Sequence, residues 1–186
     1  LPNTTYYLRA KATQGKFTES GYGPVMSAST VNPSLSFSIS TSNLALGSLL
    51  AGTVVDAPAT IDITFATNAL SGGDVYINGK NTGLYSALAS STITSASADL
   101  TPASRGFGAR VTATGASSGT FSSVAPYNGA SNNVGITDTT IRRIMTASAP
   151  VVGGTGSVLI KAKSASTDPA ANDYTETLTM LASASF

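Results

Sequence analysis

The sequence predicts an all-β fold built as an antiparallel β-sandwich. Ser, Thr, Ala and Gly dominate the 186 residues, while the strong helix formers Glu, Lys and Gln are scarce. Several segments alternate apolar and polar residues, which is the period-2 pattern of a strand with one buried face. Clusters of Gly, Asn, Asp and Pro separate these segments and mark turns. We therefore expect strands joined by turns and loops, without a long helix.

The composition narrows the class of function. Only 10% of the residues are charged and the formal net charge is +1, which argues against a nucleic-acid-binding protein, because phosphate neutralisation needs clustered Lys and Arg. The mean hydropathy of +0.16 argues against intrinsic disorder. The chain has no His and no Cys, so the usual Ser-His-Asp and Cys-His nucleophiles are excluded. We expect a protein that is not an enzyme and needs no cofactor.

The longest apolar run, residues 44–55, contains Gly47 and Gly52. It is too short and too interrupted to cross a bilayer, which takes about 20 apolar residues. We therefore expect no membrane span.

Residues 1–30 predict a β-hairpin with a long loop. The apolar residues from Tyr6 to Ala12 alternate with Tyr7, Arg9 and Lys11, and residues 25–30 supply the second strand. Pro33 ends this part of the chain, because proline lacks the backbone N–H that a sheet needs. We expect a partial domain at residues 1–30, a linker at residues 31–34 and a β-sandwich domain at residues 35–186.

This hairpin resembles the last two strands of a fibronectin type III domain. The resemblance rests on Pro2, Thr4, Tyr6, Leu8, Ala10 and Ala12, followed by Gly21, Tyr22, Gly23, Pro24 and Ser27. It implies that Tyr6 matches the tyrosine whose hydroxyl bonds to backbone a few residues upstream. An isolated hairpin is marginally stable in water. Either the chain is cut from a longer tandem protein, which is the simpler interpretation, or another molecule or the following domain completes the hairpin.

The segment from Ile61 to Phe65 is the cleanest short strand of the second domain. Val75 and Ile77 are expected to form its hairpin partner, closing at the turn signal Asn78-Gly79. Further strands are expected at residues 36–40, 91–94, 107–113, 137–146 and 158–162, with a turn at Gly153-Gly154. About eight or nine strands without a convincing helix favour an immunoglobulin-like (Ig-like) sandwich.

Two stretches of this domain are less regular. Residues 137–146 combine a helical spacing of apolar residues with frequent β-branched residues, and we expect a strand. Residues 115–133 are rich in Gly, Ser and Asn, and we expect a long surface loop.

The last fourteen residues predict a closing strand. Its apolar residues occupy even-numbered positions and would lie on one face of the strand: Tyr174, Leu178, Met180, Ala182, Ala184 and Phe186. At about 3.3 Å per residue the segment would extend roughly 43 Å, well beyond the ~17 to 20 Å of an ordinary strand. We expect it to cross the whole domain or to leave it.

Four short motifs of the second domain carry another resemblance. They are Leu44-Ala45-Leu46-Gly47, Thr67-Asn68-Ala69 followed by Ser71-Gly72, Gly106-Phe107-Gly108, and the end of the chain from Tyr174-Thr175-Glu176-Thr177 to Phe186. Together they resemble a C-terminal domain of surface proteins from ultrasmall candidate-phyla (Patescibacteria-type) bacteria, and more distantly the WxL and spore-coat-U domains. The motif TNA-x-SGY of that family becomes TNALSGG here and loses its tyrosine. The resemblance implies an exported β protein located at the cell surface or in a filament.

Two groups of residues could form a calcium site or an isopeptide bond. Asp168, Asn172 and Asp173 share one loop and could offer oxygen ligands to Ca²⁺, but polar turn residues alone explain such a cluster and are the favoured interpretation. An isopeptide bond from Lys161 or Lys163 to an Asn, with Glu176 as the acid, needs a buried lysine. The alternation of the penultimate strand places both lysines outward, so we expect no such bond.

These observations favour an extracellular structural protein whose copies assemble by β-strand addition into a surface filament or layer. The strand donor would be the closing strand or the first hairpin. The expected interface residues are Tyr6, Leu8, Tyr174, Leu178, Met180 and Phe186. The alternative is an adhesin that grips glycan or protein through loops 80–104 and 115–133, whose aromatic residues are Tyr85, Phe121 and Tyr127.

Overall fold

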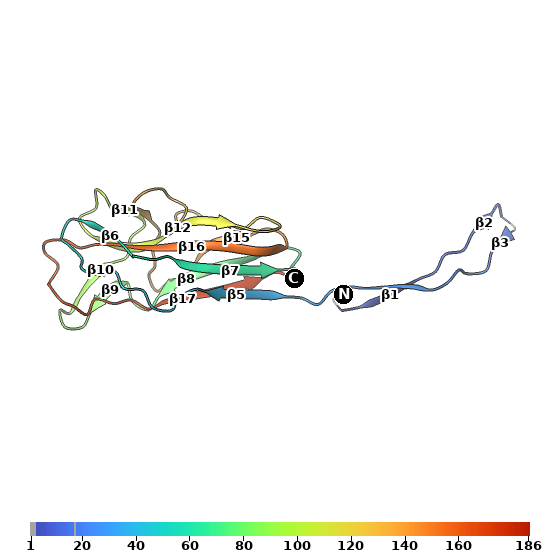
Figure 1. Ribbon diagram of the computed structural model, residues 1–186, viewed down its shortest axis with the longest axis horizontal. Coiled ribbons are helices and arrows are strands. Elements are labelled where there is room, and N and C mark those ends of the chain that lie inside the picture. Colours follow the sequence, from blue (N-terminus) through green and yellow to red (C-terminus); the bar gives the residue numbers. More distant parts are fainter. Residues whose placement is uncertain (1–2, 17) are drawn as a thin grey trace. The chain divides into compact units, whose positions relative to one another are not determined.

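The computed structural model describes residues 3–16 and 18–186 (Figure 1). Within these ranges the regular structure consists of strands alone, without a helix, as the sequence predicts. No described segment is a helix long and apolar enough to span a membrane. The chain divides into two compact units, Leu1–Pro33 and Ser34–Phe186, which are described separately below.

The first unit is an antiparallel hairpin. β1 (Thr5–Leu8) pairs with β4 (Met26–Ser29), and β2 (Thr13–Gln14) pairs with β3 (Thr18–Glu19). The predicted strand from Tyr6 to Ala12 is therefore shorter than expected, since β1 ends at Leu8. None of the described residues of this unit is buried.

The first sheet of the second unit contains five strands. β5 (Leu35–Ile39), β7 (Ile61–Thr67), β16 (Val151–Lys163) and β12 (Gly106–Gly115) lie side by side in the order β12-β16-β7-β5. The short β6 (Val54–Asp56) pairs with the end of β16. Every pairing in this sheet is antiparallel.

The second sheet contains four strands in the order β13-β15-β8-β17. They are β8 (Gly73–Gly79), β13 (Ser122–Ser123), β15 (Arg142–Ala147) and β17 (Leu178–Ala184). Two short pairs complete the unit: β9 (Gly83–Ser86) with β10 (Ser91–Thr94), and β11 (Ala98–Asp99) with β14 (Asn133–Val134).

The apolar faces of the two sheets share one core, which makes the unit a β-sandwich. Ile63 and Phe65 of β7 and Val75 and Ile77 of β8 are almost completely buried and belong to the same cluster. The ring of Phe65 stacks on that of Phe121, with 5.0 Å between the ring centroids and 5° between their planes. Alternation in the sequence produces this core, because every second side chain of each strand points inward.

The prediction of a hairpin between β7 and β8 is wrong. β7 pairs with β5 and β16, whereas β8 pairs with β15 and β17 in the other sheet. Asn78 and Gly79 do not form a two-residue turn but continue β8, opposite Thr179 and Leu178. The alternation located both strands correctly, but it carries no information on which strand each one meets.

The predicted turn at Gly153-Gly154 is also wrong. Both residues lie inside β16, where its pairing with β7 shifts register between Val151 and Gly154. Gly153 has a φ of +58°, which a glycine adopts without steric cost. The glycines therefore form a bulge within a long strand.

The closing strand is shorter than expected. β17 has seven residues, and the chain before it makes an isolated bridge between Thr175 and Tyr85. The predicted alternation is confirmed from Leu178 to Ala184, where every second side chain is half-buried and its neighbours are exposed. Phe186 follows the strand and is 65% exposed.

The structure shows what the two less regular stretches, residues 137–146 and 115–133, form. A strand is confirmed within residues 137–146, because β15 begins at Arg142. The prediction of a surface loop over residues 115–133 is wrong in part, since Phe121 and Tyr127 are buried in the core.

Candidate functional site

β5 and β17 are the end strands of the two sheets, and they lie side by side at one margin of the sandwich (Figure 1). Within the described part of the chain each of them pairs along one edge only, β5 with β7 and β17 with β8. An end strand leaves a row of N–H and C=O groups that another strand can pair with.

A cleft of about 1010 Å³ opens at this margin of the sandwich. Two irregular segments, residues 39–51 and 164–177, form its walls together with Leu178 and Met180 of β17. Its floor is made by apolar residues of the core: Ile61, Leu84, Ile93, Phe107 and Ile160. These floor residues are buried, so the cleft reaches down to the core without exposing it.

One wall is an extended, leucine-rich segment. Leu44, Leu46 and Leu49 are half-buried and pack against the core, while Ala45 and Gly47 between them are exposed. This alternation is typical of a strand, yet residues 40–53 form no strand.

The backbone of this wall explains why it is irregular. Between Leu44 and Leu49 no N–H or C=O group is hydrogen-bonded to any other described residue. The nearest backbone bonds are those of Gly52 to Ser164 and of Thr53 to Leu50. Backbone N–H and C=O groups without a partner in the chain are available to an added strand, so this segment can take part in a sheet ladder.

The opposite wall is fixed by the side chain of Glu176. Its carboxylate accepts hydrogen bonds from the backbone N–H groups of Lys80 (2.8 Å), Asn81 (3.0 Å) and Thr177 (2.9 Å). Tyr174 donates from its hydroxyl to the carbonyl oxygen of Pro169 over 3.0 Å. Three of the six predicted interface residues, Tyr174, Leu178 and Met180, thus line the cleft.

The loop with the predicted calcium ligands uses its carboxylates within the protein. Asp168 accepts from the Arg105 guanidinium over 2.5 Å and from the Ala165 N–H over 2.7 Å. Asp173 accepts from the Ser86 hydroxyl and from the Leu88 N–H, and these donors hold the pKa of Asp173 below its usual value. No group of three or more acidic, His or Cys residues suited to a metal occurs among the described residues, and Asn172 is exposed on this loop.

The other predicted interface residues lie elsewhere. Tyr6 and Leu8 are 48% and 66% exposed on β1 of the first unit. In the register of β1 with β4, Tyr6 is opposite Ala28 and Leu8 is opposite Met26. One face of this hairpin is therefore apolar and the other, with Thr5, Tyr7, Ser27 and Ser29, is mostly polar. We call the first of these the apolar hairpin face (Tyr6, Leu8, Met26, Ala28).

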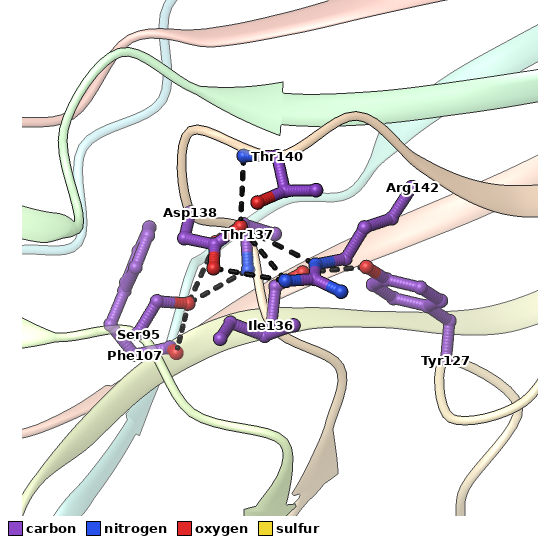
Figure 2. A network of polar contacts seen from close by, with 8 residues as sticks. All are labelled: Ser95, Phe107, Tyr127, Ile136, Thr137, Asp138, Thr140 and Arg142. Carbon is purple, nitrogen blue, oxygen red and sulfur yellow. Dashed lines mark hydrogen bonds and ion pairs between the residues drawn. The ribbon is translucent and has the colours of Figure 1, made fainter.

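A buried polar network joins the two sheets at residues 136–138 (Figure 2). Ser95 donates to the carbonyl of Phe107 over 3.0 Å and accepts from the N–H of Thr137 over 2.8 Å. The Tyr127 hydroxyl donates to the carbonyl of Ile136 over 2.5 Å. Burial raises the pKa of Tyr127 to about 12.

Asp138 extends this network with an ion pair to Arg142, separated by 3.0 Å (Figure 2). The Arg142 guanidinium lowers the pKa of Asp138, and the carboxylate raises the pKa of Arg142. The network links segments that are distant in sequence and so fixes the segment at residues 136–138 between the sheets.

Lys161 and Lys163 are buried, so the prediction that both point into solvent is wrong. The alternation itself holds, because Ile160 and Ala162 face the core. The outer face of β16 is covered instead by the short pair β11 and β14. A Cβ atom on Gly108, which is opposite Lys161, would lie 2.8 Å from the side chain of Val134.

The aromatic residues of the two long loops differ in burial. Phe121 and Tyr127 are 3% and 1% exposed and belong to the core, whereas Tyr85 is 39% exposed. Two of the three side chains that an adhesin could use for stacking on a sugar are therefore occupied within the protein.

Sequence reasoning missed the leucine-rich segment as a wall of the cleft. The signal was present, because Leu44 and Leu46 alternate with small residues, but Gly47 and Gly52 have φ angles of +72° and +77° and interrupt the strand. Lys161 and Asn132 were also missed as neighbours, since their proximity depends on the packing of β14 over β16.

No protein-family model, no curated protein and no solved structure matches this chain.

Proposed function

We propose that this protein is a structural subunit of an extracellular assembly, a filament or layer at the cell surface, in which copies associate by β-strand addition. The cleft is the acceptor, and the hairpin of a second copy is the donor. The resemblance to bacterial surface proteins, the low charge and the small side chains support the location.

The unpaired backbone of Leu44–Leu49 carries the proposal. Leu44 and Leu46 occupy alternate inward positions, as in a strand, up to Gly47, whose φ of +72° ends the extended stretch. A strand placed beside these residues gains main-chain hydrogen bonds while the two leucines keep their contacts with the core. Each net hydrogen bond contributes about 1 kcal/mol, and apolar contact over the cleft adds to it.

The hairpin suits the role of donor better than the closing strand does. β17 is paired with β8 over all seven of its residues, so donating it would break the second sheet. The apolar hairpin face is largely exposed within its own unit, since Leu8 and Met26 are 66% and 73% exposed. The resemblance to fibronectin type III strands implies that such a face is normally covered by further strands.

The cleft and the apolar hairpin face both carry little charge. Among the residues lining the cleft, Asp168 and Glu176 are the charged ones, and both are bonded within the chain. A largely uncharged cleft accepts a largely uncharged hairpin face without leaving a buried charge unpaired.

Negative-stain electron microscopy and analytical ultracentrifugation of the full chain test the proposal. We expect polymers or concentration-dependent oligomers for the wild type, and monomers for Leu46→Asp, which puts a charge into the wall of the cleft. Leu70→Asp is the matched control, because it makes the same substitution at a leucine that is 83% exposed and does not line the cleft. It should assemble like the wild type.

Circular dichroism melting curves must show that both variants are folded. Should Leu46→Asp unfold, Leu46→Thr replaces it as a milder change in the same position. A wild type that stays monomeric at every concentration would overturn the proposal. Equal assembly by a folded Leu46 variant would also overturn it.

A further inference from the structure

We propose that Lys161 and Asn132 form an intramolecular isopeptide bond, promoted by Asp56. The inference is independent of the assembly proposed above, because all three residues belong to the second unit of one chain.

The three side chains meet on the outer face of the first sheet. The Lys161 Nζ atom donates to the Oδ1 atom of Asp56 over 2.6 Å and to the Oδ1 atom of Asn132 over 3.1 Å. Lys161 is 3% exposed, and it faces Asp56 directly in the pairing of β16 with β6. An amine, a carboxamide and a carboxylate are thus held together by three separate segments.

The amide of Asn132 is oriented for the reaction. Its Nδ2 atom donates to the Thr101 hydroxyl over 3.1 Å, so the carbonyl oxygen points to the lysine while the nitrogen that would leave points away from it. A plain ion pair requires Lys161 and Asp56 alone. The orientation of Asn132 adds the electrophile, and holding both reactants in place lowers the entropic part of the barrier.

The reaction balances without an external reagent. The Asp56 carboxylate takes a proton from the Lys161 ammonium, and the neutral Nζ attacks the Cγ atom of Asn132. Asp56 passes its proton to Nδ2 as the Cγ–Nδ2 bond breaks, and takes the second proton from Nζ, which it then releases to water. The products are a Lys161–Asn132 amide, one molecule of ammonia and one proton.

Lys163 provides an internal comparison. It is 7% exposed, two residues further along β16, and its Nζ donates to the backbone carbonyls of Leu100 (3.1 Å) and Thr101 (2.9 Å). No side-chain amide is bonded to its amine in the described part of the chain. We therefore expect Lys163 to remain a free amine.

Mass spectrometry of the intact, denatured protein tests the bond. We expect the wild type and Lys163→Arg to be lighter than their sequence masses by one ammonia. Lys161→Arg and Asn132→Ser should have their full masses, and Asp56→Asn should stay largely unreacted. A tryptic digest should yield a branched peptide that joins the segment containing Asn132 to the segment containing Lys161.

The branched peptide is essential, since succinimide formation at Asn78-Gly79 or Asn128-Gly129 also releases ammonia. A folded wild type with its full sequence mass would overturn the inference. A loss of ammonia that persists in Lys161→Arg, without a branched peptide in the wild type, would overturn it as well. Because Lys163→Arg changes a lysine that is also buried, it separates loss of the bond from loss of the fold.

Discussion

Leu8 of β1 lies directly opposite Met26 of β4, and both side chains are exposed, at 66% and 73%. Their neighbours Tyr7 and Ser27 form the next pair and point to the other face. The hairpin therefore has one apolar face and one mostly polar face, and a single substitution can place a charge on either face.

Leu8→Lys should weaken self-association at least about tenfold, which corresponds to ~1.4 kcal/mol, because it places a charge on the apolar hairpin face. Tyr7→Lys carries the same charge on the opposite face and should change association little. Sedimentation velocity over a concentration series measures both. If the two variants lose association equally, the apolar face has no special role.

Tyr127→Phe should reduce the dependence of stability on alkaline pH. The folded-state pKa of Tyr127 is about 12 and the ordinary value is 10.0, so the unfolded chain ionises first as the pH rises. The unfolded state then binds fewer protons, and the free energy of unfolding falls between pH 10 and 12, by about 1 kcal/mol at pH 11.

At pH 8 the variant should be about 1 kcal/mol less stable than the wild type, since the hydrogen bond to Ile136 is lost. The two stabilities should meet near pH 11, and above that pH the variant should be the more stable protein. Urea unfolding followed by far-ultraviolet circular dichroism at several pH values provides the data. Parallel curves would mean that Tyr127 ionises alike in both states.

Gly135→Ala should destabilise the second unit by about 1 to 3 kcal/mol. A Cβ atom at position 135 would lie 2.4 Å from the ring of Tyr127, which is itself fully buried. Gly115→Ala is the matched control, because its Cβ atom would meet only the Thr155 hydroxyl oxygen at 3.4 Å. Thermal unfolding of both variants measures the difference; similar melting temperatures would show that Tyr127 can move aside.

Asp138→Asn should lower stability at neutral pH and lose that effect in acid. The pairing with Arg142 lowers the folded-state pKa of Asp138, so its contribution is present above the ordinary pKa and disappears as the pH falls through the folded-state value. We expect a loss of about 1 kcal/mol at pH 7 that diminishes as the pH falls below 3.8, the ordinary pKa of an aspartate. A difference that does not change with pH would assign the loss to packing.

The sequence was sufficient for the fold class and for most strand positions. The alternation from Ile61 to Phe65 identified β7, and the same reasoning located β10 at Ser91–Thr94. Both depend on local periodicity, which a single strand carries within itself.

The pairing of strands and the cover of their outer faces could not be predicted in the same way. Asn78-Gly79 has the residues of a tight turn, but β17 pairs alongside it and keeps it extended. The side chain of Lys161 points away from the core, as the alternation predicts. It is nevertheless buried, because β14, which pairs with β11 and is distant from Lys161 in the sequence, covers it. Such contacts depend on tertiary packing rather than on the pattern of any one segment.

One measurement tests directly whether the hairpin of one copy reaches the cleft of another. Met26→Cys gives the chain a single thiol, because the natural sequence has no Cys. A benzophenone maleimide attached to that thiol is irradiated together with isotope-labelled copies that carry no probe, and the crosslinked peptides are mapped by mass spectrometry. We predict crosslinks from the probe to residues 39–51 or 164–180 of the labelled copy. Crosslinks confined to the chain that carries the probe, or spread over the labelled copy without enrichment in these two segments, would contradict assembly through the cleft.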